Sequence, residues 1–292
     1  MVLYDRSATN LQQQIAILKR RQLKINDTKT TRNRIQDIGY FKLKGYCIPF
    51  YSKKDYFRSN TSFNTVYSAY KLDEKMRIIL FPMLQRIEVQ FKALLGSYLG
   101  TKYGPLGYLN TPMFATFAGK SEWLACIKRN EKRGRKRNEA YICHYQNEYD
   151  DKFPIWVAIE MSSLGDVSKL YSNLKTNDKK NFAMKYYHMN YQKLSNWLQV
   201  ITIIRNICAH NARLFSKKIP LNIYINRYDH ISKNNSKTLF GVLYICKTLL
   251  MGTDFFQYQI INLKQVLKQT PFQGFYEYGL PDDWCQKLLE KE

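Results

Sequence analysis

The stretch AYKLDEKMRIILFPMLQRIEVQFKALLGSY, residues 69–98, decides the fold class. Its apolar residues recur every three or four positions, which is the period of an α-helix with one buried face. Pro82 lies inside this segment and can bend the helix. Asp73 and Arg77 stand one turn apart, at the spacing of an ion pair. Glu88 falls beside the apolar stripe, so it is a candidate partner for a buried arginine.

The same helical spacing continues on both sides of this segment. The further helices are predicted at residues 11–24, 29–38, 167–174, 194–214, 239–251 and 255–266. The glycines and proline of GYFKLKGYCIPF, residues 39–50, mark turns in a compact aromatic block that is either structural or stacks on RNA. We therefore predict an all-α fold. Its expected parts are an N-terminal helical and aromatic extension (1–55), a helical core (56–218) and a C-terminal helical element (219–292).

The chain is strongly basic. Its 46 Lys and Arg against 23 Asp and Glu give 292 residues a formal charge of +23. A polyanion is therefore the expected partner: nucleic acid first, an anionic membrane surface second. The composition does not separate RNA from DNA. The 15% aromatic content, including 23 Tyr, suits both a packed core and stacking on unpaired bases.

Two clusters of basic residues are candidate RNA contacts. One is Lys19, Arg20 and Arg21, at the end of a short amphipathic helix. The other is a dense run whose candidate contacts are Arg129, Lys132, Arg133, Arg135, Lys136 and Arg137. Such a run repels itself unless a polyanion neutralises it, but it can equally be a solvated helix end or a loop.

Neither a metal site nor a secreted or membrane protein is indicated. The six cysteines are scattered without the spacing of zinc ligands or of a disulfide framework. No segment approaches the roughly 18 apolar residues of a membrane span, and the N-terminus lacks the apolar core of a signal peptide. We expect a cytoplasmic protein without metal or cofactor.

The segment IIRNICAHNARL, residues 203–214, places Arg205, Asn206 and His210 in an otherwise apolar helix. On an ideal helix Arg205 falls within the apolar sector, whereas Asn206, His210 and Arg213 share the polar side. Arg205 and His210 are then about 140° apart in projection. For both to reach one phosphate, the arginine must swing round, the helix must deform or end near Ala209, or a second copy of the protein must supply part of the site.

These three residue types suit the cleavage of RNA. Imidazole can take or give a proton near neutral pH, guanidinium can stabilise the charge on a phosphate, and an amide can orient either group. Without a metal, the expected nucleophile is the RNA's own 2′-hydroxyl, which leaves a 2′,3′-cyclic phosphate and a 5′-hydroxyl. The alternative is that Arg205 is a buried structural arginine held by Glu88 or Glu160, with His210 alone touching the substrate.

The spacing of Arg205 and His210 resembles the R-x(4-6)-H signature of the HEPN superfamily of ribonucleases. The surrounding sequence resembles the AbiD/AbiF branch of bacterial abortive-infection proteins over roughly residues 4–214. The segments that carry this resemblance are GYFKLKGYCIPF (39–50), QRIE (85–88) and FPIWVAIEMSSLG (153–165).

The resemblance implies a HEPN-like helical bundle that acts as an RNA-cleaving anti-phage toxin, held in check in some systems by a small RNA. It also implies a homodimer that brings two Arg205–His210 motifs together, because this chain contains one. The competing interpretation is a non-catalytic RNA-binding scaffold. A DNA-binding regulator is disfavoured, because no helix-turn-helix signature is evident.

Overall fold

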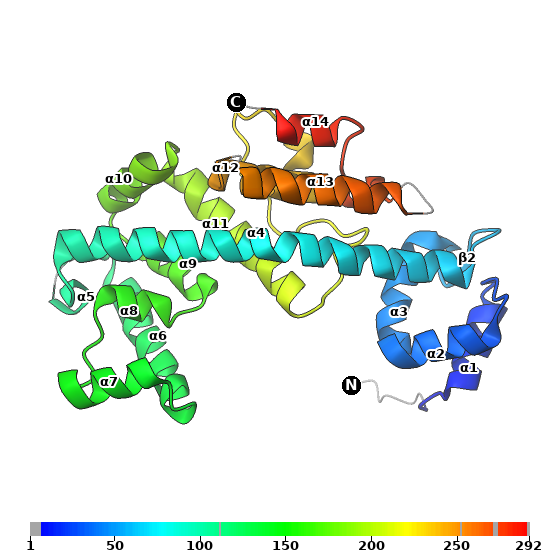
Figure 1. The fold of residues 1–292 in the computed structure, drawn as a ribbon, viewed down its shortest axis with the longest axis horizontal. Helices are drawn as coiled ribbons and strands as arrows, with labels where there is room; N and C mark the ends of the chain where they lie inside the picture. The colour runs from blue at the N-terminus through cyan, green and yellow to red at the C-terminus, as the bar shows by residue number, and fades with distance from the viewer. Residues whose placement is uncertain (1–6, 111, 252, 271–273, 291–292) are drawn as a thin grey trace.

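The protein is all-α, as predicted. The computed structural model describes residues 7–110, 112–251, 253–270 and 274–290. Helix α4 (Phe63–Tyr103) runs along the length of the molecule, and many of the other helices pack against it (Figure 1). Its 41 residues span about 60 Å. Buried side chains occur along its whole length because α3, α8, α11 and α13 all contact it.

Helix α4 is longer at both ends than its apolar pattern predicted. It begins after Ser62, whose side chain accepts a hydrogen bond from the Thr65 amide, and it ends at Gly104, which has a φ of +78°. Pro82 lies inside the helix without ending it. Asp73 and Arg77 form the expected ion pair, at 2.5 Å, and both side chains are buried.

The N-terminal helices lie at one end of α4 (Figure 1). Their elements are α1 (Leu11–Arg20), α2 (Thr28–Ile38), α3 (Tyr40–Cys47), η1 (Ile48–Phe50) and a hairpin of β1 (Tyr51–Lys53) and β2 (Tyr56–Phe57). The prediction of turns across residues 39–50 holds at Gly39 and Pro49 but was wrong at Gly45, because most of this block is helix α3. Gly39, with a φ of +81°, separates α3 from α2. Leu43 and Tyr46 are fully buried, so tertiary packing outweighs the local signal of the glycines.

The opposite end of α4 carries the middle of the chain (Figure 1). Its helices are α5 (Gly107–Asn110), α6 (Phe117–Lys136), α7 (Ala140–Tyr149), α8 (Ile155–Glu160), α9 (Leu164–Asn173), α10 (Thr176–Tyr187) and α11 (Tyr191–Ala209). Helix α8 packs closely on α4: a Cβ added at Gly96 would lie 3.2 Å from Trp156. Glycines on α4 thus allow the close approach of the Trp156 segment.

The C-terminal elements pack on the middle of α4 (Figure 1). They are η2 (Lys233–Lys237), α12 (Leu239–Leu249), α13 (Asp254–Lys268), η3 (Tyr276–Tyr278) and α14 (Trp284–Leu289). One continuous hydrophobic core contains residues from all three of the predicted parts. The predicted boundaries at residues 55 and 218 therefore stay a prediction. The first and last residues of the predicted parts, 1–6 and 291–292, lie outside the described residues.

Candidate functional site

Helix α11 ends at Ala209, so the prediction of a helix to Leu214 was wrong. His210 is the C-cap residue, and Asn211 adopts a left-handed conformation with a φ of +52°. The amide of Ala212 donates to the carbonyl of Ile207 at 2.9 Å, and that of Asn211 donates to Cys208 at 3.2 Å. This pair of bonds is a Schellman motif, which asparagine at this position favours. The helix thus ends near Ala209, as one of the three alternatives required, and His210 directly follows its last residue.

Arg205 lies at the edge of the protein surface. Its Nε is 3.2 Å from Oε2 of Glu88, and its Nη1 donates to Oδ1 of Asn206 at 3.3 Å. The Arg205 side chain is 30% exposed, whereas that of Glu88 is 11% exposed. Glu88 therefore holds Arg205, as the structural interpretation expected, but the Arg205 side chain is not fully buried.

Glu88 holds two cations at once. Its second carboxylate oxygen is 3.2 Å from the ammonium of Lys92, one helical turn further along α4. The Lys92 ammonium also donates to the backbone carbonyl of Glu160, at 3.4 Å. Glu160 itself is exposed, so its carboxylate is not the buried partner of a cation that the sequence predicted. Its backbone oxygen makes the contact because α8 ends there and leaves its carbonyls free to accept.

His210 and Asn206 are both exposed. The His210 amide donates to the carbonyl of Asn206 at 3.0 Å, the last regular backbone bond of α11. Arg205, Asn206 and His210 therefore all lie in the last two turns of this helix or at its C-cap. An imidazole can exchange protons there, and a guanidinium offers positive charge to an anion.

The loop behind His210 is fixed by Asp73, which is fully buried. Its carboxylate accepts hydrogen bonds from the amides of Leu214 and Phe215, at 3.0 and 2.8 Å. The hydroxyls of Tyr46 and Tyr278 also donate to it, at 2.7 and 3.0 Å. Burial and the Asp73 charge raise the pKa of Tyr278 well above its ordinary value, so this phenol stays protonated and donates.

Sequence reasoning found the Asp73–Arg77 pair but missed the loop that it holds. Arg77 donates through Nη1 to the backbone carbonyl of Ala212 at 3.3 Å. Asp73 and Arg77, which are one turn apart on α4, therefore both bind the loop that follows the motif. Tyr278 belongs to η3, so a residue far along the chain also contributes to this anchor. No local spacing signals such a contact.

The predicted RNA contacts do not form one surface. Lys19, Arg20 and Arg21 lie at the end of α1, whereas the dense basic run is the last part of α6, near the opposite end of α4 (Figure 1). Arg213 lies in the loop after His210, where it donates to the carbonyl of Phe215 at 3.0 Å.

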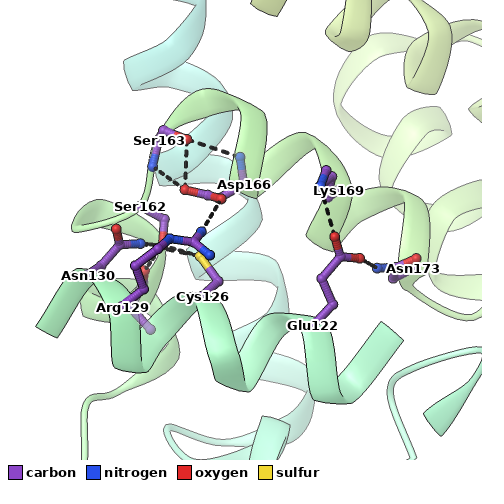
Figure 2. A network of polar contacts seen from close by, with 10 residues as sticks. Glu122, Cys126, Arg129, Asn130, Ser162, Ser163, Asp166, Lys169 and Asn173 are labelled. Carbon is purple, nitrogen blue, oxygen red and sulfur yellow. Dashed lines mark hydrogen bonds and ion pairs between the residues drawn. The ribbon is translucent and has the colours of Figure 1, made fainter. Parts of the chain in front are cut away.

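Several of these arginines already face carboxylates. Arg21 is 3.2 Å from Asp55, and Arg137 is 3.9 Å from Glu139. Arg129 pairs with Asp166 at 2.8 Å, within the polar network between α6 and α9 that Figure 2 shows. These ion pairs reduce the charge that the arginines offer to a nucleic acid.

Arg135 bridges Glu131 and Asp151, at 2.5 and 2.6 Å. By contrast, Lys132, Arg133 and Lys136 are exposed and have no ion-pair partner among the described residues. These three side chains are therefore the part of the α6 run most available to an external anion.

The described residues contain no group of three or more His, Cys, Asp or Glu side chains placed to hold a metal ion. Over the same residues, no helix combines the length and apolar character that crossing a membrane requires.

A family model described as "Abi-like protein" matches residues 33–216. This range includes α3, the whole of α4 and the Arg205–His210 motif. It stops before α12, α13 and α14. No curated protein and no solved structure matches the chain.

Proposed function

The chain belongs to the Abi-like protein family, and from this premise we propose that it acts in abortive infection as a metal-independent endoribonuclease of the HEPN type. The observation that carries the proposal is the end of α11, where Glu88 and Asn206 orient Arg205 and where His210 is exposed within the same two turns of helix. We further propose that it works in the cytoplasm as an anti-phage toxin. Restraint by a bound small RNA is compatible with the +23 charge.

In the proposed reaction the 2′-oxygen attacks the adjacent phosphorus and the bond to the 5′-oxygen breaks. A general base takes the proton of the 2′-hydroxyl, and a general acid gives one to the leaving 5′-oxygen. His210 fills one of these roles. Arg205 stabilises the negative charge that develops on the phosphate. Asn206 keeps the guanidinium of Arg205 oriented. The products are a 2′,3′-cyclic phosphate and a 5′-hydroxyl.

The other proton-transfer role falls, in this proposal, to a second copy of the motif in a homodimer. Two exposed apolar residues on α4 favour association beside the site. Ile78 and Val89 are each 65% exposed, and they directly follow Arg77 and Glu88 in sequence. At about 100° per residue, Ile78 and Val89 share one face of α4, roughly a quarter turn from Arg77 and Glu88. Burying such side chains is a source of dimer stability.

The proposal is tested with purified protein from which nucleic acid has been stripped, in the presence of a chelator. We expect cleavage of single-stranded RNA, no cleavage of DNA of the same sequence, and cyclic-phosphate ends on the products. Cleavage of DNA, or 3′-hydroxyl ends, would contradict the proposed chemistry. Tight RNA binding without any cleavage would favour the alternative, a non-catalytic RNA-binding scaffold. In that case Arg205, held in place by Glu88, would only bind the RNA.

Substitutions of Glu88 and of its second partner, Lys92, test whether Glu88 positions Arg205 for catalysis. We expect Glu88→Ala to lower kcat by up to about 10²-fold with little change in KM, because Arg205 loses the partner that positions it. Lys92→Met is the control: it breaks the other ion pair of Glu88 but leaves the Arg205 contact. Both proteins are compared by single-turnover cleavage below their melting temperatures. Equal rates for the two variants would contradict a positioning role for Glu88.

The exposed end of the α6 run is expected to contact phosphates. Replacing Lys132, Arg133 and Lys136 together by Gln should reduce the slope of log affinity against log salt for single-stranded RNA by about 2. The measurement is RNA binding by the full chain across a range of salt concentrations. The control replaces Lys237, Lys264 and Lys268, which are exposed on other elements. A slope changed equally by both triple variants would mean that the α6 run has no special role.

A further inference from the structure

A groove of about 400 Å³ lies between α9 and α11, the helix that carries the motif. Helix α11 contributes Gln199, Thr202 and Ile203 to its lining. Helix α9 contributes Ser168 and Ser172, among others. We call it the α9–α11 groove. Its volume falls within the range of small-molecule binding sites.

The α9–α11 groove and the motif share one side of α11. At about 100° per residue, Gln199, Thr202 and Ile203 fall within one sector of roughly 100°, and Asn206 falls inside the same sector. Asn206 follows Thr202 by one turn, about 6 Å along the axis. His210 caps the same helix about 10 Å beyond Ile203. A strand of RNA with its phosphate at His210 would therefore reach the groove within one or two nucleotides.

The lining of the α9–α11 groove suits the edge of a base. Gln199 is exposed and offers an amide, and Ser172 offers a hydroxyl. Ser168 is 3% exposed, and its hydroxyl has no hydrogen-bond partner among the described residues. A buried hydroxyl without a partner is unfavourable, so a ligand that bonds to it gains affinity. Neutral donors and acceptors of this kind distinguish bases by their hydrogen-bonding edges.

The charges at the rim suit the rest of a nucleotide. Lys169 extends from α9 with 68% of its side chain exposed, and its ammonium is 2.9 Å from the carboxylate of Glu122. Asn173 donates to the other oxygen of Glu122 at 3.0 Å, so this carboxylate is held by two donors (Figure 2). The pairing with Glu122 reduces the charge that Lys169 offers, but its exposed ammonium has room for a second contact with a phosphate. A polar lining with one exposed lysine at the rim suits a base joined to a phosphate.

We propose that the α9–α11 groove binds one nucleoside of the RNA strand next to the phosphodiester that is cut at His210, and that it sets the base preference of cleavage. This inference rests on the proposed ribonuclease function. It names a binding role for residues of α9 and α11 that lie outside the Arg205–His210 motif.

The first test measures base preference with a random-sequence RNA library and sequencing of the cut ends. We expect wild-type protein to prefer one base at a position flanking the cut. Gln199→Ala and Ser172→Ala should each weaken that preference roughly 2- to 10-fold, the effect of losing one hydrogen bond. Gln265→Ala, an exposed glutamine on α13, is the matched control and should keep the wild-type preference. Unchanged preference in both groove variants would overturn the inference while leaving the nuclease intact.

The second test locates the RNA without relying on cleavage. Single-stranded RNA that carries 4-thiouridine is photocrosslinked to the His210→Ala protein, and the crosslinked peptides are mapped by mass spectrometry. Crosslinks within residues 165–173 or 199–203 support the inference. RNA crosslinks confined to other elements overturn it, as do protein–protein crosslinks through the groove, which would show a second copy there. Failure of the wild-type protein to cut any RNA would instead overturn the proposed function, and the preference with it.

Discussion

His210→Ala is expected to lower the rate of RNA cleavage by about 10²- to 10⁴-fold, the usual contribution of a general acid or base. The fold should survive the change, because His210 is exposed and the structure uses its backbone, not its imidazole, to end α11. RNA affinity should stay within a few-fold of the wild type. The measurements are single-turnover cleavage at saturating protein and direct binding of the same RNA.

His230→Ala is the matched control for this variant, since His230 is another exposed histidine, distant in sequence from the motif. It should cleave at the wild-type rate. If His210→Ala cut RNA as fast as His230→Ala and left the same product ends, the proton transfer would belong to another group and the assignment of His210 would be wrong.

Asp73→Ala is expected to lower the free energy of unfolding by about 3–5 kcal/mol, the usual cost of removing one partner of a buried ion pair. The substitution leaves the buried guanidinium of Arg77 without its carboxylate. It also leaves the amides of Leu214 and Phe215 without the acceptor that they use. The quantity is read from urea unfolding followed by circular dichroism.

Two further variants calibrate the Asp73 result. Asp37→Ala removes an exposed carboxylate from α2 and should change stability by less than about 0.5 kcal/mol. Tyr278→Phe removes one donor to Asp73 and should cost about 0.5–1.5 kcal/mol. If the free energy of unfolding of Asp73→Ala were within about 1 kcal/mol of the wild-type value, Asp73 would not be the anchor of the loop behind His210.

The sequence predicts best where one helix decides the outcome. The apolar period of residues 69–98 predicts α4, and the spacing of Asp73 and Arg77 predicts their ion pair. Prediction from the sequence fails where a tertiary contact decides whether a helix forms. Helix α3 forms in a block with two glycines because Leu43 and Tyr46 enter the core. Helix α10 begins in a polar stretch whose Asp178 is buried and bonded to Tyr103 at 2.7 Å.

The candidate site shows the same division. Glu88 was expected beside an arginine because of its place on the apolar stripe, and Arg205 does meet it. The apolar period predicted that α11 continues to Leu214, although Asn211 is a recognisable stop signal for a helix. The carboxylate of Glu160 was expected in the core, but the side chain is exposed. Helical spacing alone cannot tell which of two acidic residues a distant cation will reach.

The most direct test of the central claim replaces a single 2′-hydroxyl. A cleavage site is first mapped on an RNA of defined sequence, and the nucleotide that supplies the 2′-oxygen there is then changed to its 2′-deoxy form. With wild-type protein we predict that cleavage stops at this position and continues at the other sites of the same RNA. Cleavage that persists at the 2′-deoxy position would contradict attack by the RNA's own hydroxyl, and with it the HEPN-type reaction proposed for Arg205 and His210.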